Sequence, residues 1–374
     1  MIFKKKSWAA VLLSRQPLRP CGKTPWISGA AEAVSWVKSQ GLGLLNSIGM
    51  QTWDLLVFLA KREEIPQIIV LPVANDCNFA QFCQDIKEEF GLEKHLTRFM
   101  ALTSTPDEIP EKELLHARDR KIIDLADFLI PISVRPGGFM EESIRKKIFS
   151  SNVGVLKSFK IPYKKRQHKL GYKIKADKNS SAPEIIGDRY LIHWTRASNG
   201  PWPTENKFSF YRDMLNSEYY PRGAFDTLQN ILKTRCIKAS SLHMPLNIQT
   251  VSFSALAPAD ALCLMRWRSR YVQMSFEPYG IGVEKTFAKK YGILPVQYYK
   301  KGNLPNCERW LTQSTGAIGD WPREAEYRFR GDLDFSDIPN DKLAVFCLTP
   351  AESKYLREHF GFAAFSIWTC NKNL

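Results

Sequence analysis

The sequence predicts an α/β protein with a Rossmann-like parallel sheet in its N-terminal part. A separate α+β domain with a mainly antiparallel or split sheet is expected to follow. The chain has 374 residues, more than one typical domain holds. Its first 150 or so residues alternate apolar runs with helical patterns, whereas the later part has short strands and few helices. We predict a ligand-binding domain over 1–152, a basic linker over 153–186 and an α+β domain over 187–374.

In the first domain, five continuous apolar runs are typical of strands buried on both faces of a parallel sheet. The predicted strands are 8–13, 42–47, 67–73, 98–104 and 127–133. Between them, apolar residues recur at helical spacing. The predicted helices are 31–40, 52–63, 79–90 and 118–126. Ligands of such sheets bind beyond the carboxyl ends of the strands, where helix N-termini present unpaired N–H groups.

The net charge of +15 is the strongest signal in the composition, and it favours a polyanionic partner such as DNA, RNA or a nucleotide. Nine Lys or Arg residues fall within Val155–Glu184, in the predicted linker. This basic segment is either a solvated connection between domains or a strip that contacts nucleic acid. Both interpretations stay open on sequence grounds.

Membrane, secretion and metal signals are absent from the sequence. No apolar run reaches the roughly 18 to 20 residues that cross a bilayer. Trp8–Leu13 is shorter than the roughly 7 to 15 apolar residues of a signal peptide, so we interpret it as a buried strand. The eight cysteines are scattered without a CxxC pair. We therefore expect no metal, reduced thiols, no membrane contact and a cytoplasmic location.

Three loops at the predicted carboxyl edge carry the candidate ligand residues. Cations and hydroxyls follow the first strand, and glycines follow the second and fifth, where the backbone N–H groups are expected to meet a phosphate. The candidates are Ser14, Arg15, Ser47, Gly49, Arg135, Gly137 and Gly138. Each glycine alone is also explained by turn geometry. Three such loops on one edge favour a phosphorylated ligand.

The stretch "ARDRKIIDLADFLIPISVRPGGFMEES" resembles the SLOG superfamily, which joins the LOG phosphoribohydrolases and the DNA-processing protein A (Smf) family. The matching residues are Arg118 or Arg120, then Ala126-Asp127, then Pro136-Gly137-Gly138. Met140 and Glu141 stand where LOG enzymes have Gly-Thr, so the resemblance implies a binding or sensing domain rather than an active hydrolase. SLOG-like domains often pair, so the resemblance also implies a homodimer.

The second domain offers polar residues on short strands. In "DRYLIHWTRAS", His193 and Thr195 share one strand face because alternate residues point to the same side. Ser252 lies on the strand "TVSFSALAP", and "RWRSRY" sets Arg268 near Tyr271. That cluster suits a phosphate or a stacked base, and equally a structural group of arginines and aromatics.

The order HxT, helix, Ser-bearing strand, "YGI" strand and late ExE resembles the ADP-ribosyltransferase-like fold of bacterial toxin and phage-resistance proteins. The resemblance implies NAD as substrate, held by His193 and by Tyr279 or Tyr271. It also implies that Glu326, with Glu324 as substitute, stabilises the charged transition state. Alternatively, His193 is a structural histidine, and the two glutamates pair with Arg328 or Arg330.

Three hypotheses follow for the whole chain. The first is a nucleotide-sensing SLOG-like domain fused to an ADP-ribosyltransferase-like effector acting on NAD or nucleic acid, in bacterial stress or phage defence. The second is a non-catalytic DNA- or RNA-binding protein similar to DNA-processing protein A. The third is a LOG-type nucleoside monophosphate phosphoribohydrolase.

Overall fold

The computed structural model describes most of the chain, in two compact units. The described residues are 6–73, 78–103, 110–164, 172, 174–176, 188–241, 244–269, 273–300, 302–315, 321–366 and 368–370. The N-terminal unit comprises Met1–Gln167 and Asn199–Pro221, and the second unit comprises His168–Ser198 and Arg222–Leu374. The predicted fold class, a parallel α/β domain followed by a mainly antiparallel α+β domain, is confirmed. Within the described residues, no helix has the length and apolarity needed to span a membrane.

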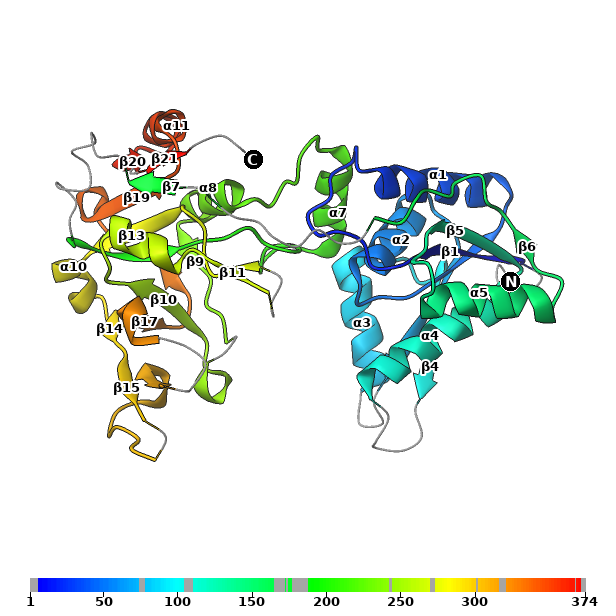
Figure 1. The fold of residues 1–374 in the computed structure, drawn as a ribbon, viewed down its shortest axis with the longest axis horizontal. Coiled ribbons are helices and arrows are strands. Elements are labelled where there is room, and N and C mark those ends of the chain that lie inside the picture. The colour runs from blue at the N-terminus through cyan, green and yellow to red at the C-terminus, as the bar shows by residue number, and fades with distance from the viewer. Residues whose placement is uncertain are drawn as a thin grey trace. The chain divides into compact units, whose positions relative to one another are not determined.

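The N-terminal unit is built on a six-stranded parallel sheet of order β4-β3-β2-β1-β5-β6 (Figure 1). Its elements are β1 Trp8–Leu13, α1 Pro25–Ser39, β2 Gly43–Asn46, α2 Gln51–Arg62, β3 Gln67–Val73, α3 Phe79–Phe90, β4 Thr97–Thr103, α4 Glu111–Leu125, β5 Phe128–Ser133, α5 Phe139–Ser150 and β6 Gly154–Val155. The side chains of Ala9 to Leu13 in β1 are at most 1% exposed, as the continuous apolar run predicts.

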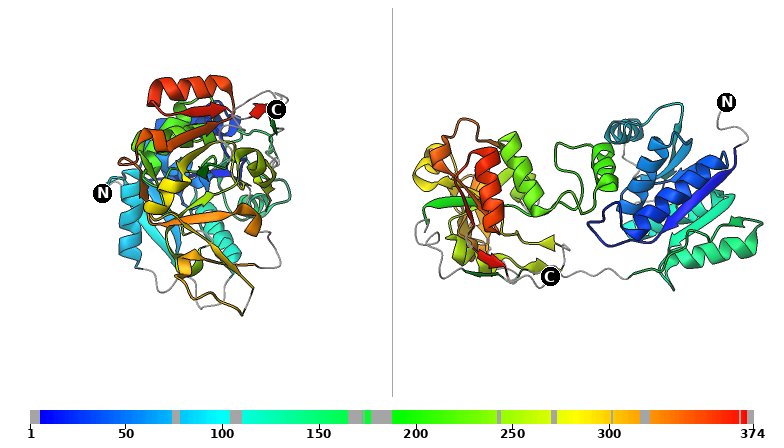
Figure 2. Two further views of the ribbon diagram at one scale, coloured as in Figure 1. Left: turned by 90° about the vertical axis from the view of Figure 1, so that its left-hand side faces the viewer. Right: turned by 90° about the horizontal axis from the view of Figure 1, so that it is seen from above.

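The strand order reverses at β1. From β1 the chain builds outward through β2, β3 and β4, and then returns to add β5 on the other side of β1. Since crossovers between parallel strands are right-handed, α1, α2 and α3 cover one face of the sheet, and α4 and α5 cover the other. The packing of α4 against α5 and of α1 against α2 agrees with this arrangement, which Figure 2 shows from two further directions. Ligands of open α/β sheets bind at such a reversal, beyond the carboxyl ends of the strands.

One helix of the N-terminal unit comes from far along the sequence. The segment Asn199–Pro221, here called the arm, holds α7 (Lys207–Asn216), which packs against α2 and α3. Asn206 caps α7 by accepting a hydrogen bond from the backbone N–H of Ser209 at 2.8 Å. The ring of Tyr211 stacks on that of Phe90, with centroids 6.4 Å apart. The sequence places these residues in the predicted domain 187–374 and predicts no helix here.

The second unit is built on a seven-stranded sheet of order β14-β17-β10-β8-β13-β19-β20, antiparallel except for the pair β19–β20. Its described elements are β7 Ile174–Ala176, β8 Tyr190–Trp194, α8 Ala224–Thr234, β9 Cys236–Ile237, η1 Pro245–Asn247, β10 Thr250–Ser254, α9 Pro258–Ala261, η2 Leu262–Leu264, β11 Trp267–Arg268, β12 Gln273–Met274, β13 Gly280–Glu284, α10 Lys285–Lys290, β14 Leu294–Pro295, β15 Gln297–Tyr299, η3 Arg309–Leu311, β16 Thr312–Ser314, η4 Trp321–Glu324, β17 Glu326–Arg330, β18 Leu333–Asp334, η5 Asn340–Lys342, β19 Leu343–Cys347, α11 Pro350–Phe360, β20 Ala364–Ser366 and β21 Trp368–Cys370.

The two faces of this sheet bury different sets of side chains. The larger core takes Leu191, Phe253 and Ile281 from the sheet, and α8 and α11 pack into it. The smaller core takes Ile192, Trp194 and other residues that alternate with the first set. The face on which a residue of β8, β10 or β17 lies therefore decides which groups it can meet.

Part of the predicted linker belongs to the second unit. β7, at Ile174–Ala176, pairs antiparallel with β21 near the C-terminal end of the described chain. The most basic stretch of the linker, which includes Lys165 and Arg166, lies outside the described residues. Whether the linker contacts nucleic acid therefore stays a prediction.

Candidate functional site

Hydrogen bonds join the two loops beside the strand reversal. The backbone N–H of Ser14, which follows β1, donates to the carbonyl oxygen of Ser133 at 2.9 Å. The hydroxyl oxygen of Ser14 accepts from the backbone N–H of Arg135, which follows β5, at 2.9 Å. These bonds fix the β1–α1 and β5–α5 loops against each other, as the sequence-predicted carboxyl edge requires. Ser14 is thereby a bridge between loops, with its hydroxyl proton left to donate.

Two arginines extend from these loops without partners. The side chains of Arg15 and Arg135 are exposed, and no described residue forms a hydrogen bond or ion pair with either guanidinium group. Other cations of the β1–α1 loop are engaged. Nε of Arg19 donates to Oδ1 of Asn199 at 3.3 Å, and Nζ of Lys23 lies 2.5 Å from Oε1 of Glu218. Arg15 and Arg135 are therefore available to an anionic ligand at the strand reversal.

The glycine turn after β5 is sterically open, but its backbone N–H groups already have hydrogen-bond acceptors. Gly137 has a φ of +65°, is exposed, and would have no atom within 4 Å of an added Cβ. However, its backbone N–H donates to Oε2 of Glu141 at 2.8 Å, and that of Gly138 to the carbonyl oxygen of Arg135 at 3.2 Å. Glu141 lies in the first turn of α5, where the helix dipole favours a carboxylate. A phosphate that binds the Gly137 amide would have to displace this side chain.

The loop after β2 is held by buried charges. Gly49 has a φ of +89°, and its N–H donates to Oδ1 of Asp54 at 3.0 Å. Arg118, only 1% exposed, donates from Nη1 to the carbonyl oxygen of Ile48 at 3.2 Å and pairs with Asp119. Arg118 is thus a support of this loop. The predicted ligand residue Ser47 is fully buried and donates its hydroxyl proton to Val70 at 2.8 Å.

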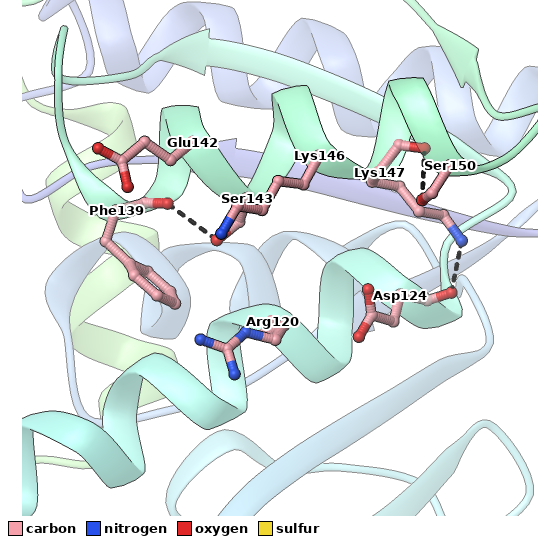
Figure 3. Close-up of a pocket in the computed structure, with 8 residues that line it drawn as sticks. All are labelled: Arg120, Asp124, Phe139, Glu142, Ser143, Lys146, Lys147 and Ser150. Atoms are coloured by element: carbon pink, nitrogen blue, oxygen red, sulfur yellow. Dashed lines mark hydrogen bonds between the residues drawn. The ribbon is translucent and has the colours of Figure 1, made fainter.

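Arg120 lies at a shallow pocket of about 110 Å³ between α4 and α5 (Figure 3). Its guanidinium group lies 5.4 Å from the ring centroid of Phe139, and the ring of His116 stacks on that of Phe139 with centroids 3.9 Å apart. The pocket is lined by Arg120, Asp124, Phe139, Glu142, Ser143, Lys146, Lys147 and Ser150. Its acidic and basic groups nearly balance, so it is less favourable for an anion than the strand reversal.

In the second unit, Glu326 forms part of a closed ion-pair network. Its two carboxylate oxygens each lie 2.9 Å from a nitrogen of Arg328, and Oε1 also accepts from the hydroxyl of Ser252 at 2.7 Å. Arg328 is 1% exposed and additionally donates to the carbonyl oxygens of Trp310 and Thr312. Glu326 therefore pairs with Arg328, as the alternative interpretation of the sequence predicts.

Glu324 and Arg268 form a second pair beside this network. Oε1 of Glu324 lies 3.2 Å from Nη2 of Arg268. Burial raises the pKa of Glu324 above its ordinary value, and the charge of Arg268 opposes this shift. Burial likewise raises the pKa of the neighbouring Tyr298 to about 12, and its hydroxyl oxygen accepts from the backbone N–H of Glu326 at 3.2 Å.

The structure does not bring His193 together with Glu326. Ile192 lies opposite Ser254, and Ser254 lies opposite Glu326, so these side chains share one sheet face. His193 follows Ile192 and lies on the other face, against Phe253. Its Nδ1 lies 2.9 Å from the carbonyl oxygen of Ser252, and burial lowers its pKa below the ordinary value. His193 is thus a neutral, hydrogen-bonded residue.

The remaining predicted residues of the second unit have structural partners. Thr195, 4% exposed, directs its hydroxyl to the carbonyl oxygen of Ala224 at 3.4 Å. The hydroxyl of Tyr279, 6% exposed, donates to Oε1 of Glu352 at 2.9 Å. Tyr271 lies outside the described residues. The expected binding of NAD therefore stays a prediction.

The Gly49 loop is supported by an ion pair between Asp54 and Lys207 that the sequence did not predict. Asp54 is 8% exposed and lies 3.4 Å from Nζ of Lys207, on α7 of the arm. Nζ of Lys207 also lies 3.0 Å from Oε2 of Glu89. Burial raises the pKa of Asp54, and Lys207 opposes that shift. A charged residue inside the apolar pattern "TWDLLVFLA" was the available signal, but its partner lies 153 positions away and cannot be found from spacing.

In the part of the chain that the structure describes, no three His, Cys, Asp or Glu side chains are grouped so as to hold a metal ion.

No family model and no curated protein matches this chain. Among solved structures, DNA processing protein A from Streptococcus pneumoniae is similar at 16% identity and a TM-score of 0.31, covering 40% of this chain and 50% of that one. DNA processing protein A from Helicobacter pylori, described as binding single-stranded DNA, is similar at 16% identity and a TM-score of 0.28, with 38% and 61% covered. The matches thus span about half of one relative and three-fifths of the other. Such values are too low to assign a function by likeness.

Proposed function

We propose that the protein binds nucleic acid, and that the N-terminal unit contacts the phosphates of a strand at the carboxyl edge of its sheet. The observation that carries this proposal is the pair of exposed arginines, Arg15 and Arg135, on the two loops joined at the strand reversal, whose guanidinium groups have no partner among the described residues. This is the position where open parallel sheets bind phosphorylated ligands. Guanidinium groups suit phosphate because their planar N–H groups match its oxygens.

The phosphates of a nucleic-acid backbone fit this edge better than the phosphate of a mononucleotide, which would have to bind inside the glycine turn. Enzymes that take up a nucleotide phosphate in a glycine turn use free backbone N–H groups. Here the N–H groups of Gly137 and Gly49 are already bonded to the carboxylates of Glu141 and Asp54. The free donors are long side chains, which reach phosphates outside the turn. The net charge of +15 adds a general attraction for a polyanion.

The proposal is tested by the salt dependence of oligonucleotide binding. A fluorescent 20-mer of thymidine is titrated with the protein at several salt concentrations, followed by fluorescence anisotropy. For single strands, the slope of log K against log salt falls by about 0.7 for each phosphate contact that is lost. The double variant R15A/R135A is therefore expected to bind more weakly and to lower the slope by about 1.4.

The matched control is R62A. Arg62 is also an exposed arginine of the N-terminal unit, but it lies at the end of α2, on the opposite edge of the sheet, and pairs with Glu63 at 2.8 Å. Its loss should leave the affinity and the slope unchanged. No binding by the parent protein, or an equal slope in the parent and R15A/R135A, would remove the proposal.

We do not extend the proposal to cleavage of NAD. The sequence resemblance implies that reaction, but His193 and Glu326 lie on opposite faces of the sheet and Glu326 is bound by Arg328. Incubation with NAD, followed by chromatography for nicotinamide, tests it directly. We expect no release with the parent protein, alone or with the oligonucleotide, and release that E326Q abolishes would restore the reaction.

A further inference from the structure

The arm, Asn199–Pro221, contacts the first loop of the candidate nucleic-acid edge. The backbone N–H of Gly22, in the β1–α1 loop, donates to the carbonyl oxygen of Ser217 at 3.0 Å. An added Cβ at Gly22 would lie 2.0 Å from the carbonyl oxygen of Leu215, so only glycine allows this approach. Asn199 and Glu218 of the arm bind Arg19 and Lys23 of the same loop. The arm therefore fixes the loop that carries Arg15.

The arm also reaches the second loop, through a chain of polar contacts. Nζ of Lys207 on α7 lies 3.4 Å from Oδ2 of Asp54, and Oδ1 of Asp54 accepts the N–H of Gly49 at 3.0 Å. The stem of Lys207 lies against Phe90, with Nζ 5.2 Å from the ring centroid, and its side chain is 20% exposed. Lys207 is thus directed at Asp54, which supports the Gly49 loop.

A well-packed apolar pair would join two helices at least as stably as this partly buried ion pair. Desolvation offsets much of the attraction between buried charges, and in some proteins such pairs instead specify one arrangement of the elements that they join; we infer this role here. The arrangement specified here is that of the Gly49 loop relative to α7. Lys207 therefore has a different role from Phe210 and Tyr211, whose apolar contacts already hold α7 to α2 and α3.

Both ends of the arm continue directly into the second unit. The backbone N–H of Ser198, just before the arm, donates to the carbonyl oxygen of Arg222, just after it, at 3.0 Å. β8 ends at Trp194 and α8 begins at Ala224, so a few residues connect the arm to the central strand and a core helix of that unit. The arm is therefore joined to these elements by short covalent connections at both of its ends.

We propose that Lys207 is a positioning residue for the nucleic-acid edge, and that through the arm it couples ligand binding at that edge to the second unit. The ligand in this inference rests on the proposed function. The positioning of the Gly49 loop by Lys207, through Asp54, does not. Lys207 forms an ion pair with Asp54, and Asp54 accepts the hydrogen bond of the Gly49 N–H. The base of the arm is joined by the hydrogen bond from the Ser198 N–H to the carbonyl oxygen of Arg222. A nucleic-acid strand that orders the β1–α1 loop, whose Gly22 N–H binds the arm at Ser217, is expected to order the arm and its base together.

The first experiment uses the full-length protein without ligand. Amide hydrogen exchange at Gly49 and Ser198 is compared in the parent, K207M, K207R and R212A. Arg212 is the control, because it lies on the same helix, is 56% exposed and, among the residues that the structure describes, pairs only with its neighbour Asp213. In K207M, both amides should exchange at least about five-fold faster, the lower range of measured coupling between sites. K207R should restore protection, and R212A should match the parent.

The second experiment adds the thymidine 20-mer. K207M should bind at least about five-fold more weakly than the parent. Its salt slope should be unchanged, because Lys207 contacts no phosphate, in contrast to R15A/R135A. In the parent, binding should slow exchange at Ser198, and in K207M this effect should be lost.

If K207M does not fold, D54N replaces it. Asparagine keeps an oxygen for the Gly49 N–H but removes the charge that Lys207 binds, so Gly49 should stay protected while the effect of the oligonucleotide on Ser198 is lost. If the parent does not bind the oligonucleotide, the proposed function fails, and the exchange without ligand still decides the coupling. Unchanged exchange at Gly49 and Ser198 in K207M, or a reduced salt slope in K207M, overturns the inference.

Discussion

The two units use charged residues in opposite ways. At the strand reversal of the N-terminal unit, Arg15 and Arg135 extend from loops into solvent without a described partner. In the second unit, Glu326 and Arg328 bind each other; the Arg328 side chain is fully buried and that of Glu326 is mostly buried. Sequence patterns made both groups candidates for a functional site. The comparison teaches that a charge is available for a ligand only where the fold leaves it unpaired, so pairing must be established before a role is assigned.

The largest effect is expected from breaking the buried pair of the second unit. In R328M, Glu326 would remain buried with no cation, and such a loss destabilises a protein by about 3–5 kcal/mol. The measurement is the free energy of unfolding of the full-length protein in urea. R330M is the matched control on the same strand. Arg330 lies 3.6 Å from Glu308, and both side chains are about two-thirds exposed, so its loss should change stability by about 0–1 kcal/mol. Equal effects would contradict the structural role of Arg328.

A smaller effect is expected from removing the carboxylate charge beside the glycine turn of the N-terminal unit. E141Q removes the charge that occupies the Gly137 N–H, and a charge at a helix N-terminus contributes about 0.3–1 kcal/mol, or about a two- to five-fold change in affinity. We therefore expect tighter binding of the thymidine 20-mer, measured by anisotropy. E142Q removes the same charge one residue later and should have less effect, because the described contact of Glu142 with the turn is made by its backbone N–H, to the carbonyl oxygen of Gly138 at 3.1 Å. An equal gain in both variants would mean that only the net charge of the helix matters.

The smallest effect concerns the protonation of His193. Because burial lowers its pKa in the folded protein, the unfolded chain binds more protons below about pH 6.5, and stability is lost as the pH falls through that range. Part of this loss should be absent in H193Q, when the free energy of unfolding is measured between pH 7.5 and 5.5. H359Q is the control, since exposed His359 also places Nδ1 near a backbone carbonyl oxygen, that of Tyr355 at 3.0 Å. A parent and H193Q with the same pH dependence would contradict a neutral, structural His193.

Much of the N-terminal fold follows from local pattern. The apolar runs at Trp8–Leu13 and Gln67–Val73 are strands, and Phe79–Phe90 is a helix, with the predicted bounds. Buried parallel strands and amphipathic helices each leave a periodic signal in the residues themselves. α7 left no clear signal, because its short apolar stripe gains stability only from α2 and α3, which are far away in the sequence.

The candidate site was predictable in position but not in detail. The loops that carry Arg15, Arg135 and Gly137 were expected at one edge of the sheet, since parallel strands align their carboxyl ends. Two neighbouring arginines of α4 could not be told apart, although Arg118 is buried and Arg120 lies at a pocket. The strand face of His193 depends on how β8 and β10 pair, and pairing between distant strands is not encoded in either strand alone.

The arm has a consequence for how the protein is made. During synthesis, the six strands of the N-terminal sheet leave the ribosome before α7 does, because β6 ends at Val155 and α7 begins at Lys207. Until then, Phe58 and Phe90 lack the aromatic partners that Phe208 and Tyr211 later supply. A fragment that stops at the predicted domain boundary would expose this apolar surface permanently. We expect such a fragment to aggregate, and one in which the arm is fused after residue 167 to remain in solution.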